Sequence, residues 1–238
     1  KNLWDKYYIQ FKKNNLLQMW DYGEFKKKYE KYNVYRYLIK NDLNQVVGLL
    51  QILEKKLFYF SFLRINRGPL LKSEHEHRLI SLVKEIKKEF QKKNTTFLSC
   101  SPELNFNSDN IIIDKKKIFK KGTWNSSRLK LENDLETILM SFKKEWRKDL
   151  KKSLNEKNLE VFVKEDKESL DKVIEHYQKE AKIKKFKSIN VDLIKHLNEK
   201  RNLMCLICEL NNEYVGSLCI AKHYPVATNL INPIFYEY

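Results

Sequence analysis

The sequence is poor in glycine and proline, with 5 and 4 residues among 238. We therefore expect neither a flexible linker nor a low-complexity tail. The chain also lacks any run of about 18 apolar residues, and the stretch KNLWDKYYIQ at its start holds no continuous apolar segment. These absences predict a fully folded protein in the cytoplasm, with no membrane span and no signal peptide.

Cysteine is scarce as well, and its four copies do not form a pattern that binds metal. The pair Cys205-x-x-Cys208 has the spacing of a zinc or redox pair, but it lies within the apolar run NLMCLICEL. No second cysteine pair or histidine cluster supplies further ligands. We expect core thiols and no metal site, and we interpret His75, His77 and His223 as structural residues too.

Negative charge is in short supply, since 47 Lys and Arg face 31 Asp and Glu, for a net charge of +16. Such a surface attracts phosphate, either on nucleic acid or at an anionic membrane. Lys, Asn, Ile and Tyr are all abundant, as codon bias in an AT-rich genome would produce. The position of the cations therefore has to identify the partner.

Apolar periodicity predicts strands alternating with amphipathic helices. We expect strands at 34–40, 45–56, 58–65, 95–100, 110–114, 126–133, 159–165, 202–210 and 213–224. We expect helices in the N-terminal region ending in LLQMWDYGEFKKKY and at 73–93, 135–154, 169–184 and 191–200, with Ser73 as an N-cap. The fold class predicted is α/β (α+β), with mixed sheets flanked by helices.

Two segments repeat one pattern. Residues 37–52 (YLIKNDLNQVVGLLQI) and 205–220 (CLICELNNEYVGSLCI) each contain an apolar strand, a polar turn and a strand with Val-Gly-x-Leu-x-Ile. The repeat predicts two related domains, at 1–133 and 159–238, joined by a basic connecting helix at 134–158. Because few residues follow Gly216, we expect the second domain to be incomplete at its C-terminus.

The connecting helix carries a cluster of positive charge. An apolar stripe of Leu139, Phe142, Trp146, Leu150 and Leu154 is predicted to pack inward. The remaining surface holds the cations Lys143, Lys144, Arg147, Lys148, Lys151 and Lys152. Crowded like charges destabilise a helix, and an anionic partner would remove that cost. A solvated lysine-rich face is the simpler alternative.

Three motifs, in order along the chain, resemble the Fem family of peptidoglycan bridge-forming aminoacyltransferases. They are Gln18-x-Trp20-x-x-Gly23-x-x-Lys26, Arg67-Gly68-Pro69, and FKKEWRKDLKKSLNEKNLEV, which leads into a strand. Members of that family contain two tandem acyltransferase domains of the GNAT type. The resemblance therefore implies a tandem GNAT-like fold, in agreement with the internal repeat.

The resemblance implies transfer of an amino acid from aminoacyl-tRNA to an amine of a peptidoglycan precursor, either lipid-linked or UDP-linked. It implies no cofactor, because the aminoacyl ester is already activated. Substrate binding would fall to Lys26, Trp20, Arg67, Gly68 and Glu103, with Lys26 at the phosphate or muramyl end of the precursor. The six cations would receive tRNA or lipid phosphate, and we expect a monomer able to contact the inner membrane face peripherally.

The sequence departs from the family pattern in several places. Where members carry an acidic residue before a proline, this chain has Ser101-Pro102-Glu103, so the carboxylate is missing or displaced to Glu103. The segment KIKKFKSINVDL does not clearly match the Arg and Tyr expected after the connecting helix. No catalytic residue can be named from the resemblance.

Other functions remain open on sequence alone. A stand-alone CoA-dependent N-acyltransferase needs a glycine-rich turn at a helix start. The five glycines, Gly23, Gly48, Gly68, Gly122 and Gly216, are too dispersed to build one. An N-acyltransferase acting on a surface polysaccharide precursor remains an alternative. A non-catalytic basic module that binds RNA or an anionic membrane is another. Arg67-Gly68-Pro69 is also compatible with a plain tight turn.

Overall fold

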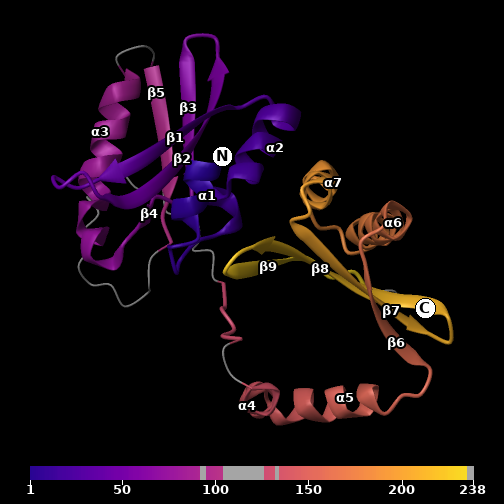
Figure 1. Ribbon diagram of the computed structural model, residues 1–238. Helices are drawn as coiled ribbons and strands as arrows, with labels where there is room; N and C mark the ends of the chain where they lie inside the picture. Colours follow the sequence, from indigo (N-terminus) through magenta and orange to yellow (C-terminus); the bar gives the residue numbers. More distant parts are fainter. Residues whose placement is uncertain (92–94, 104–125, 132–133, 235–238) are drawn as a thin grey trace.

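The computed structural model contains two β-sheets, each flanked by helices (Figure 1), and describes residues 1–91, 95–103, 126–131 and 134–234. The helices are α1 (Asn2–Tyr8), α2 (Trp20–Glu30), α3 (Leu79–Gln91), α4 (Leu135–Ser141), α5 (Lys144–Leu154), α6 (Lys167–Ile183) and α7 (Val191–Glu199). The strands are β1 (Asn33–Lys40), β2 (Val46–Leu57), β3 (Phe60–Asn66), β4 (Leu70–Leu71), β5 (Thr95–Ser101), β6 (Leu159–Lys164), β7 (Leu203–Leu210), β8 (Glu213–His223) and β9 (Val226–Ile231). The mixed α/β class predicted from the sequence is confirmed.

The first sheet has the strand order β1-β2-β3-β5, with β4 paired to β2. Neighbours are antiparallel except β3 and β5, which run parallel. The apolar run of β2 is buried on both faces: Leu50 and Ile52 pack toward α3, and Leu49 and Leu53 pack toward α1 and α2. Such burial explains why this strand reads as continuously apolar rather than alternating.

The second sheet has the order β6-β7-β8-β9, all antiparallel. One face is covered by α6 and α7, which lie on the side away from α5 (Figure 1). Val173 and Ile194 of these helices are fully buried, as are Cys219 and Ala221 of β8. Both helices begin at side-chain caps, since Asp166 accepts from the Ser169 N–H and Asn190 from the Asp192 N–H.

The N-terminal helices join the two sheets. One hydrophobic cluster contains residues of α1 and α2 together with residues of α6, α7 and the second sheet. Polar contacts cross the same boundary: Asn202 donates to the Asp21 carboxylate at 2.8 Å, and His196 Nε2 lies 3.1 Å from the Asp21 carbonyl oxygen. The predicted boundaries at 133 and 158 stay predictions, because this core spans both halves.

The internal repeat is present in three dimensions. In the β1–β2 hairpin the register passes from Gly48 to Val46, so Val47 forms a bulge. In the β7–β8 hairpin it passes from Gly216 to Tyr214, with Val215 as the extra residue. Each glycine also pairs with a segment that follows a later proline, Gly48 with Leu71 and Gly216 with Ile234. The two halves thus repeat more than the sequence pattern indicated.

The helix predicted at 135–154 is two helices, which corrects the prediction of one. Phe142 has an extended backbone (ψ 152°) and ends α4, and Lys143 caps α5. The Arg147 guanidinium donates to the carbonyl oxygens of Met140 and Phe142, and this contact stabilises the break. Apolar periodicity continues through the break, so it could not reveal the interruption.

Smaller predictions were also wrong. Ser73 is not an N-cap: Lys72 caps a 3-10 helix over Ser73–Arg78, and α3 begins only at Leu79. The predicted strand at 126–133 has no regular structure over 126–131, and 132–133 lie outside the described residues, as does the strand predicted at 110–114. The short strands β4 and β9 were not predicted. No helix in the described parts of the chain is both long and apolar enough to cross a bilayer.

Candidate substrate-binding site

The first two motifs of the resemblance meet at Gln18. This side chain is fully buried, and its Nε2 donates to the carbonyl oxygens of Asn66 at 2.8 Å and Gln51 at 3.3 Å. Its Oε1 accepts from the Gln51 N–H at 2.8 Å. A Cβ atom at Gly68 would lie 2.5 Å from Gln18 Nε2, so glycine leaves room for this amide. Gln18 therefore locks the N-terminal motif onto the Arg67-Gly68-Pro69 turn.

Trp20 and Gly23 of the same motif hold Arg36. The guanidinium carbon of Arg36 lies 3.7 Å from the Trp20 ring centre, and its Nη2 donates to the Trp20 carbonyl and to Glu24. Burial lowers the pKa of Arg36, opposed by the bond to Glu24. A Cβ atom at Gly23 would collide with this guanidinium and with Gln51. The motif builds a buried scaffold here, and substrate binding by Trp20 stays a prediction.

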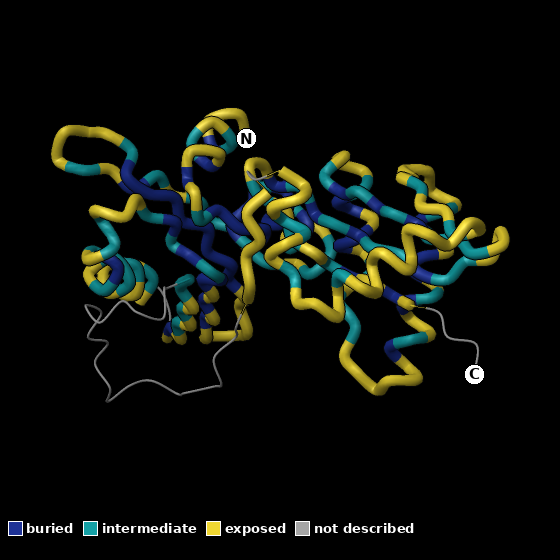
Figure 2. Tube along the Cα trace, turned by 90° about the horizontal axis from the view of Figure 1, so that it is seen from below, coloured by how far each residue is buried: buried dark blue, intermediate teal, exposed yellow. Residues whose placement is uncertain are grey.

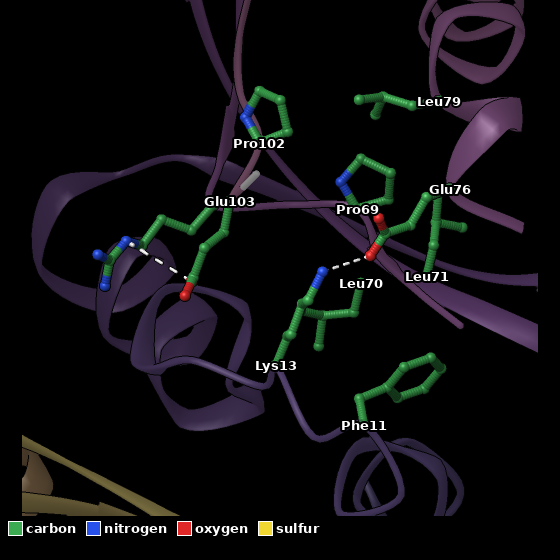
Figure 3. Close-up of a pocket in the computed structure, with 10 residues that line it drawn as sticks. Phe11, Lys13, Pro69, Leu70, Leu71, Glu76, Leu79, Pro102 and Glu103 are labelled. Atoms are coloured by element: carbon green, nitrogen blue, oxygen red, sulfur yellow. Dashed lines mark hydrogen bonds and ion pairs between the residues drawn. The ribbon is translucent and has the colours of Figure 1, made fainter. Parts of the chain in front are cut away.

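A small pocket lies beside the Arg67-Gly68-Pro69 turn (Figure 3). It measures about 30 Å³ and is lined by Phe11, Lys13, Arg67, Pro69, Leu70, Leu71, Glu76, Leu79, Pro102 and Glu103. Lys13 and Glu76 point toward each other and form an ion pair at 2.5 Å. The volume suits a small polar group such as an amine, and it is too small for a nucleotide.

The Glu103 carboxylate is held by two arginines. Its Oε1 accepts from Arg128 Nη2 at 2.6 Å, and its Oε2 lies 3.9 Å from Arg67 Nε. That second oxygen is shielded from solvent and has no hydrogen-bond partner within the described parts of the chain. A shielded carboxylate oxygen without a donor is costly, so Glu103 keeps an acceptor available to a group that enters the pocket.

Lys26 lies elsewhere, outside both described pockets. Its Nζ pairs with Glu30 at 2.7 Å, one helical turn along α2, and its side chain is 17% exposed. The ammonium group lies 5.4 Å from the ring centre of Tyr22 and 5.7 Å from that of Tyr32. Neither described pocket brings Lys26 together with Arg67, and binding of the precursor by Lys26 stays a prediction.

Two cations that sequence reasoning missed lie near Lys26. Lys55 Nζ lies 5.1 Å from the Tyr32 ring centre and donates to the Glu30 carbonyl. Arg64, exposed on β3, is close enough to lower the pKa of Tyr22, although burial raises it overall. Both residues occupy exposed positions of strands that periodicity had placed correctly, and only the fold brings them to Lys26.

The predicted cations of the connecting helix are exposed, with one exception. Lys143, Lys144, Lys148, Lys151 and Lys152 are open to solvent, whereas Arg147 is half-buried against the end of α4. The inward packing of the apolar stripe is wrong: Trp146 is 69% exposed and Leu154 is 74% exposed. Figure 2 shows α5 exposed along most of its length. The helix is accessible to a large anionic partner on several sides.

Cys205, Cys219 and His223 are buried, as the structural interpretation expected, whereas Cys100 and Cys208 are only partly buried. Cys205 and Cys219 are buried opposite each other in β7 and β8, and all four cysteines are free. His223 is buried, with Nε2 2.8 Å from Thr228 Oγ1, and burial lowers its pKa to about 4. No cluster of three or more potential ligands for a metal ion occurs among the described residues.

Comparison with solved structures identifies the fold. A structure described as FemX superposes with a TM-score of 0.80 at 14% identity, covering 100% of this chain and 79% of that one. A conserved protein of unknown function from Bacteroides thetaiotaomicron gives 0.55 at 12% identity, covering 98% and 76%. No family model matches the sequence, and neither does any curated protein. The chain has the fold of FemX, a GNAT-like fold, as the sequence resemblance implied.

Proposed function

We propose that the protein is an aminoacyltransferase, which moves an amino acid from aminoacyl-tRNA to an amine of a peptidoglycan precursor. The observation that carries this proposal is the buried junction at which Gln18 donates to the Asn66 carbonyl and leaves no room for a side chain at Gly68. It joins two motifs that sequence resemblance had linked to the Fem family, within a chain that superposes over its whole length on FemX. A chance likeness in sequence would not place both motifs at one buried junction.

The reaction makes modest demands on the protein. The neutral amine attacks the ester carbonyl carbon, an amide forms, and the ribose hydroxyl of the tRNA leaves. The amine must lose a proton as the C–N bond forms. Because the ester is already activated, holding the two groups about 3 Å apart supplies much of the rate. No cofactor is required by this chemistry.

Glu103 is our candidate for positioning the acceptor amine. Its Oε2 lies at the pocket and has no donor among the described residues. A carboxylate accepts a hydrogen bond from an amine and would orient its lone pair toward the ester. Arg67, next to Gly68 in the chain, would form part of the wall of the same pocket, while Lys26 would bind precursor phosphate at a separate position.

The exposed lysines of α5 are assigned to tRNA phosphate. They lie on a helix that has no buried residue, so packing against a core does not explain why lysines occupy these positions. Affinity for tRNA should then fall steeply with salt. Arg147 is excluded from the main contact surface, because its guanidinium is engaged at the α4–α5 break.

The test supplies tRNA charged with radiolabelled amino acids together with a UDP-linked or lipid-linked precursor, and follows label transfer. Glu103→Gln should reduce turnover at least about tenfold while leaving tRNA binding unchanged. Lys26→Ala should weaken precursor binding. Lys172→Gln on α6, an exposed charge far from these sites, is the control. No transfer with any pairing of donor and precursor would refute the proposal.

The same measurements distinguish the proposed function from two others. A surface polysaccharide acyltransferase would transfer label to a glycan precursor and leave the stem peptide unmodified. A non-catalytic basic module would bind RNA through α5, with Lys144→Gln and Lys148→Gln lowering affinity while Glu103→Gln and Lys26→Ala have no effect. The exposed basic face of α5 is the observation that favours this second candidate.

A further inference from the structure

The most exposed aromatic group in the described chain lies at the tip of the β2–β3 hairpin. Phe58 is 89% exposed and Tyr59 is 83% exposed, and these two residues form the turn. Phe60, Phe62 and Phe97 continue the surface along β3 and β5, each at least 43% exposed, and Phe62 stacks on Phe97 at 5.3 Å. We call these five residues the aromatic tip. A continuous exposed aromatic surface of this kind marks a site of interaction.

The Phe-Tyr sequence of this turn does not favour the folded hairpin. Phe58 adopts φ 51°, in the left-handed region that two-residue hairpin turns require. Glycine and asparagine adopt a positive φ readily, and an aromatic residue does so at a cost. Neither ring is buried to offset that cost. Contact with a partner therefore explains the Phe-Tyr sequence of this turn better than folding does.

Positive charge accompanies the aromatic tip. Lys55 and Lys56 immediately precede it on β2, and Arg64 follows on β3, all exposed. Lys56 has a weak ion pair with Glu54 at 4.0 Å, and Arg64 forms no ion pair with another described residue. Aromatic rings with flanking cations match the interface of an anionic bilayer, where rings sit at headgroup level and cations meet lipid phosphates.

We propose that the aromatic tip inserts into the surface of an anionic lipid bilayer and holds the protein there peripherally. The turn between β2 and β3 lies at one end of the molecule (Figure 1), so it can reach a lipid layer. A second copy of the chain is a poorer occupant, since stable protein interfaces engage about 20–30 residues per side and the tip offers a turn and two strand ends. Helix α5 lies at the opposite end (Figure 1), leaving it open to solvent while the tip is inserted.

The decisive measurement is sedimentation with vesicles of phosphatidylcholine, alone or mixed with phosphatidylglycerol. The wild-type protein should bind the anionic vesicles. The double variant F58N/Y59G should lower the partition coefficient by about tenfold, because binding scales with buried apolar area. Asparagine tolerates the positive φ at position 58 better than phenylalanine does, so the melting temperature should stay equal or rise. Lys56→Gln should weaken binding about fivefold, against no change for Lys172→Gln.

A matched control separates the tip from general surface hydrophobicity. The double variant W146S/L150S removes exposed apolar groups from α5 and should leave vesicle binding unchanged. Equal binding by F58N/Y59G and the wild type, or loss of binding in W146S/L150S alone, would refute the proposal. So would a wild-type dimer in analytical ultracentrifugation that F58N/Y59G converts to monomers. Because the readout is binding, the outcome does not depend on the proposed transferase activity.

Discussion

The two Val-Gly hairpins share a sequence pattern and a bulge, yet their glycines are packed very differently. A Cβ atom at Gly48 would lie 2.8 Å from the Leu70 carbonyl oxygen and 2.6 Å from a Leu71 methyl carbon. At Gly216 the nearest atom, the Pro233 carbonyl oxygen, would be 3.4 Å away. The same motif therefore leaves no space for a side chain at Gly48 and nearly enough for one at Gly216.

The residue three positions after each glycine also differs between the hairpins. In the first hairpin it is Gln51, which exchanges hydrogen bonds with Gln18 and thereby fixes the hairpin to the N-terminal motif. In the second it is Cys219, which faces Cys205 across the sheet. The first half is held by polar contacts that demand one geometry, and the second by apolar packing that tolerates more than one.

Removing Gln18 is expected to have the largest effect. Gln18→Ala deletes three buried hydrogen bonds, which Gln18 makes with the Gln51 N–H and with the carbonyl oxygens of Gln51 and Asn66. We expect the free energy of unfolding to fall by about 4 kcal/mol, measured by urea denaturation. Cys219→Ala in the second half should cost about 1–2 kcal/mol. Equal losses of unfolding free energy in the two variants would contradict the proposed difference between polar contacts in the first half and apolar packing in the second.

The two glycines give a second test. Gly48→Ala should destabilise the protein by about 3 kcal/mol, because the backbone oxygen of Leu70 cannot move away without breaking the β2–β4 pairing. Gly216→Ala should change stability by less than about 1 kcal/mol, since 3.4 Å requires only a small adjustment. Thermal unfolding of both variants measures the difference. Similar melting temperatures would mean that the two hairpins are equally adaptable.

The sequence predicted the elements of both halves better than it predicted what joins them. Alternation and apolar runs revealed β1 to β3 and β5 to β8, because strand period is a local property. The break at Phe142 depends on Arg147 reaching back to the carbonyl oxygens of the preceding helix, which no period reveals. Strand β9 reads VATNLI, a short segment that was missed although four of its six residues are apolar. Its pairing with β8 was visible only in three dimensions.

The buried contacts of His223 with the N-terminal segment should make the stability of the protein depend on pH. His223 on β8 lies 3.4 Å from both Tyr8 OH and Asn14 Oδ1, and burial lowers its pKa to about 4, with Arg128 acting in the same direction. The unfolded chain, with a pKa of about 6.5, binds more protons between these values. Stability should therefore fall as pH drops through 6.5, by about 2 kcal/mol at pH 5 relative to pH 7.

The variant His223→Gln isolates this contribution. It should flatten the dependence of unfolding free energy on pH between 7 and 5, whereas Gln18→Ala should shift the whole curve without changing its slope. His196, whose pKa is also lowered by burial, adds a smaller contribution of the same sign. A slope unaffected by His223→Gln would show that other groups cause the acid sensitivity.

The candidate site was only partly predictable. Arg67 and Glu103 were named from sequence, and the structure places both at one pocket. Lys13 and Arg128 were not, because only the fold brings them to their partners Glu76 and Glu103, which lie 63 and 25 residues away in the chain. Lys26 was correctly placed on a helix, but its neighbours Lys55 and Arg64 come from strands. A motif identifies positions in a fold, and the residues around them follow only from the packing.

Helix caps provide the smallest and most local comparison between the halves. Asn190 caps α7 by accepting from the Asp192 N–H at 2.9 Å, whereas Ser73, which the sequence suggested as the cap before α3, makes no capping bond. Asn190→Ala should cost about 1 kcal/mol and Ser73→Ala less than about 0.5 kcal/mol, both measured by urea denaturation. Because neither residue touches the pocket, label transfer should be unchanged in both variants at temperatures well below melting. A larger loss for Ser73→Ala would mean that α3 begins at Ser73 in solution, as its sequence pattern predicts.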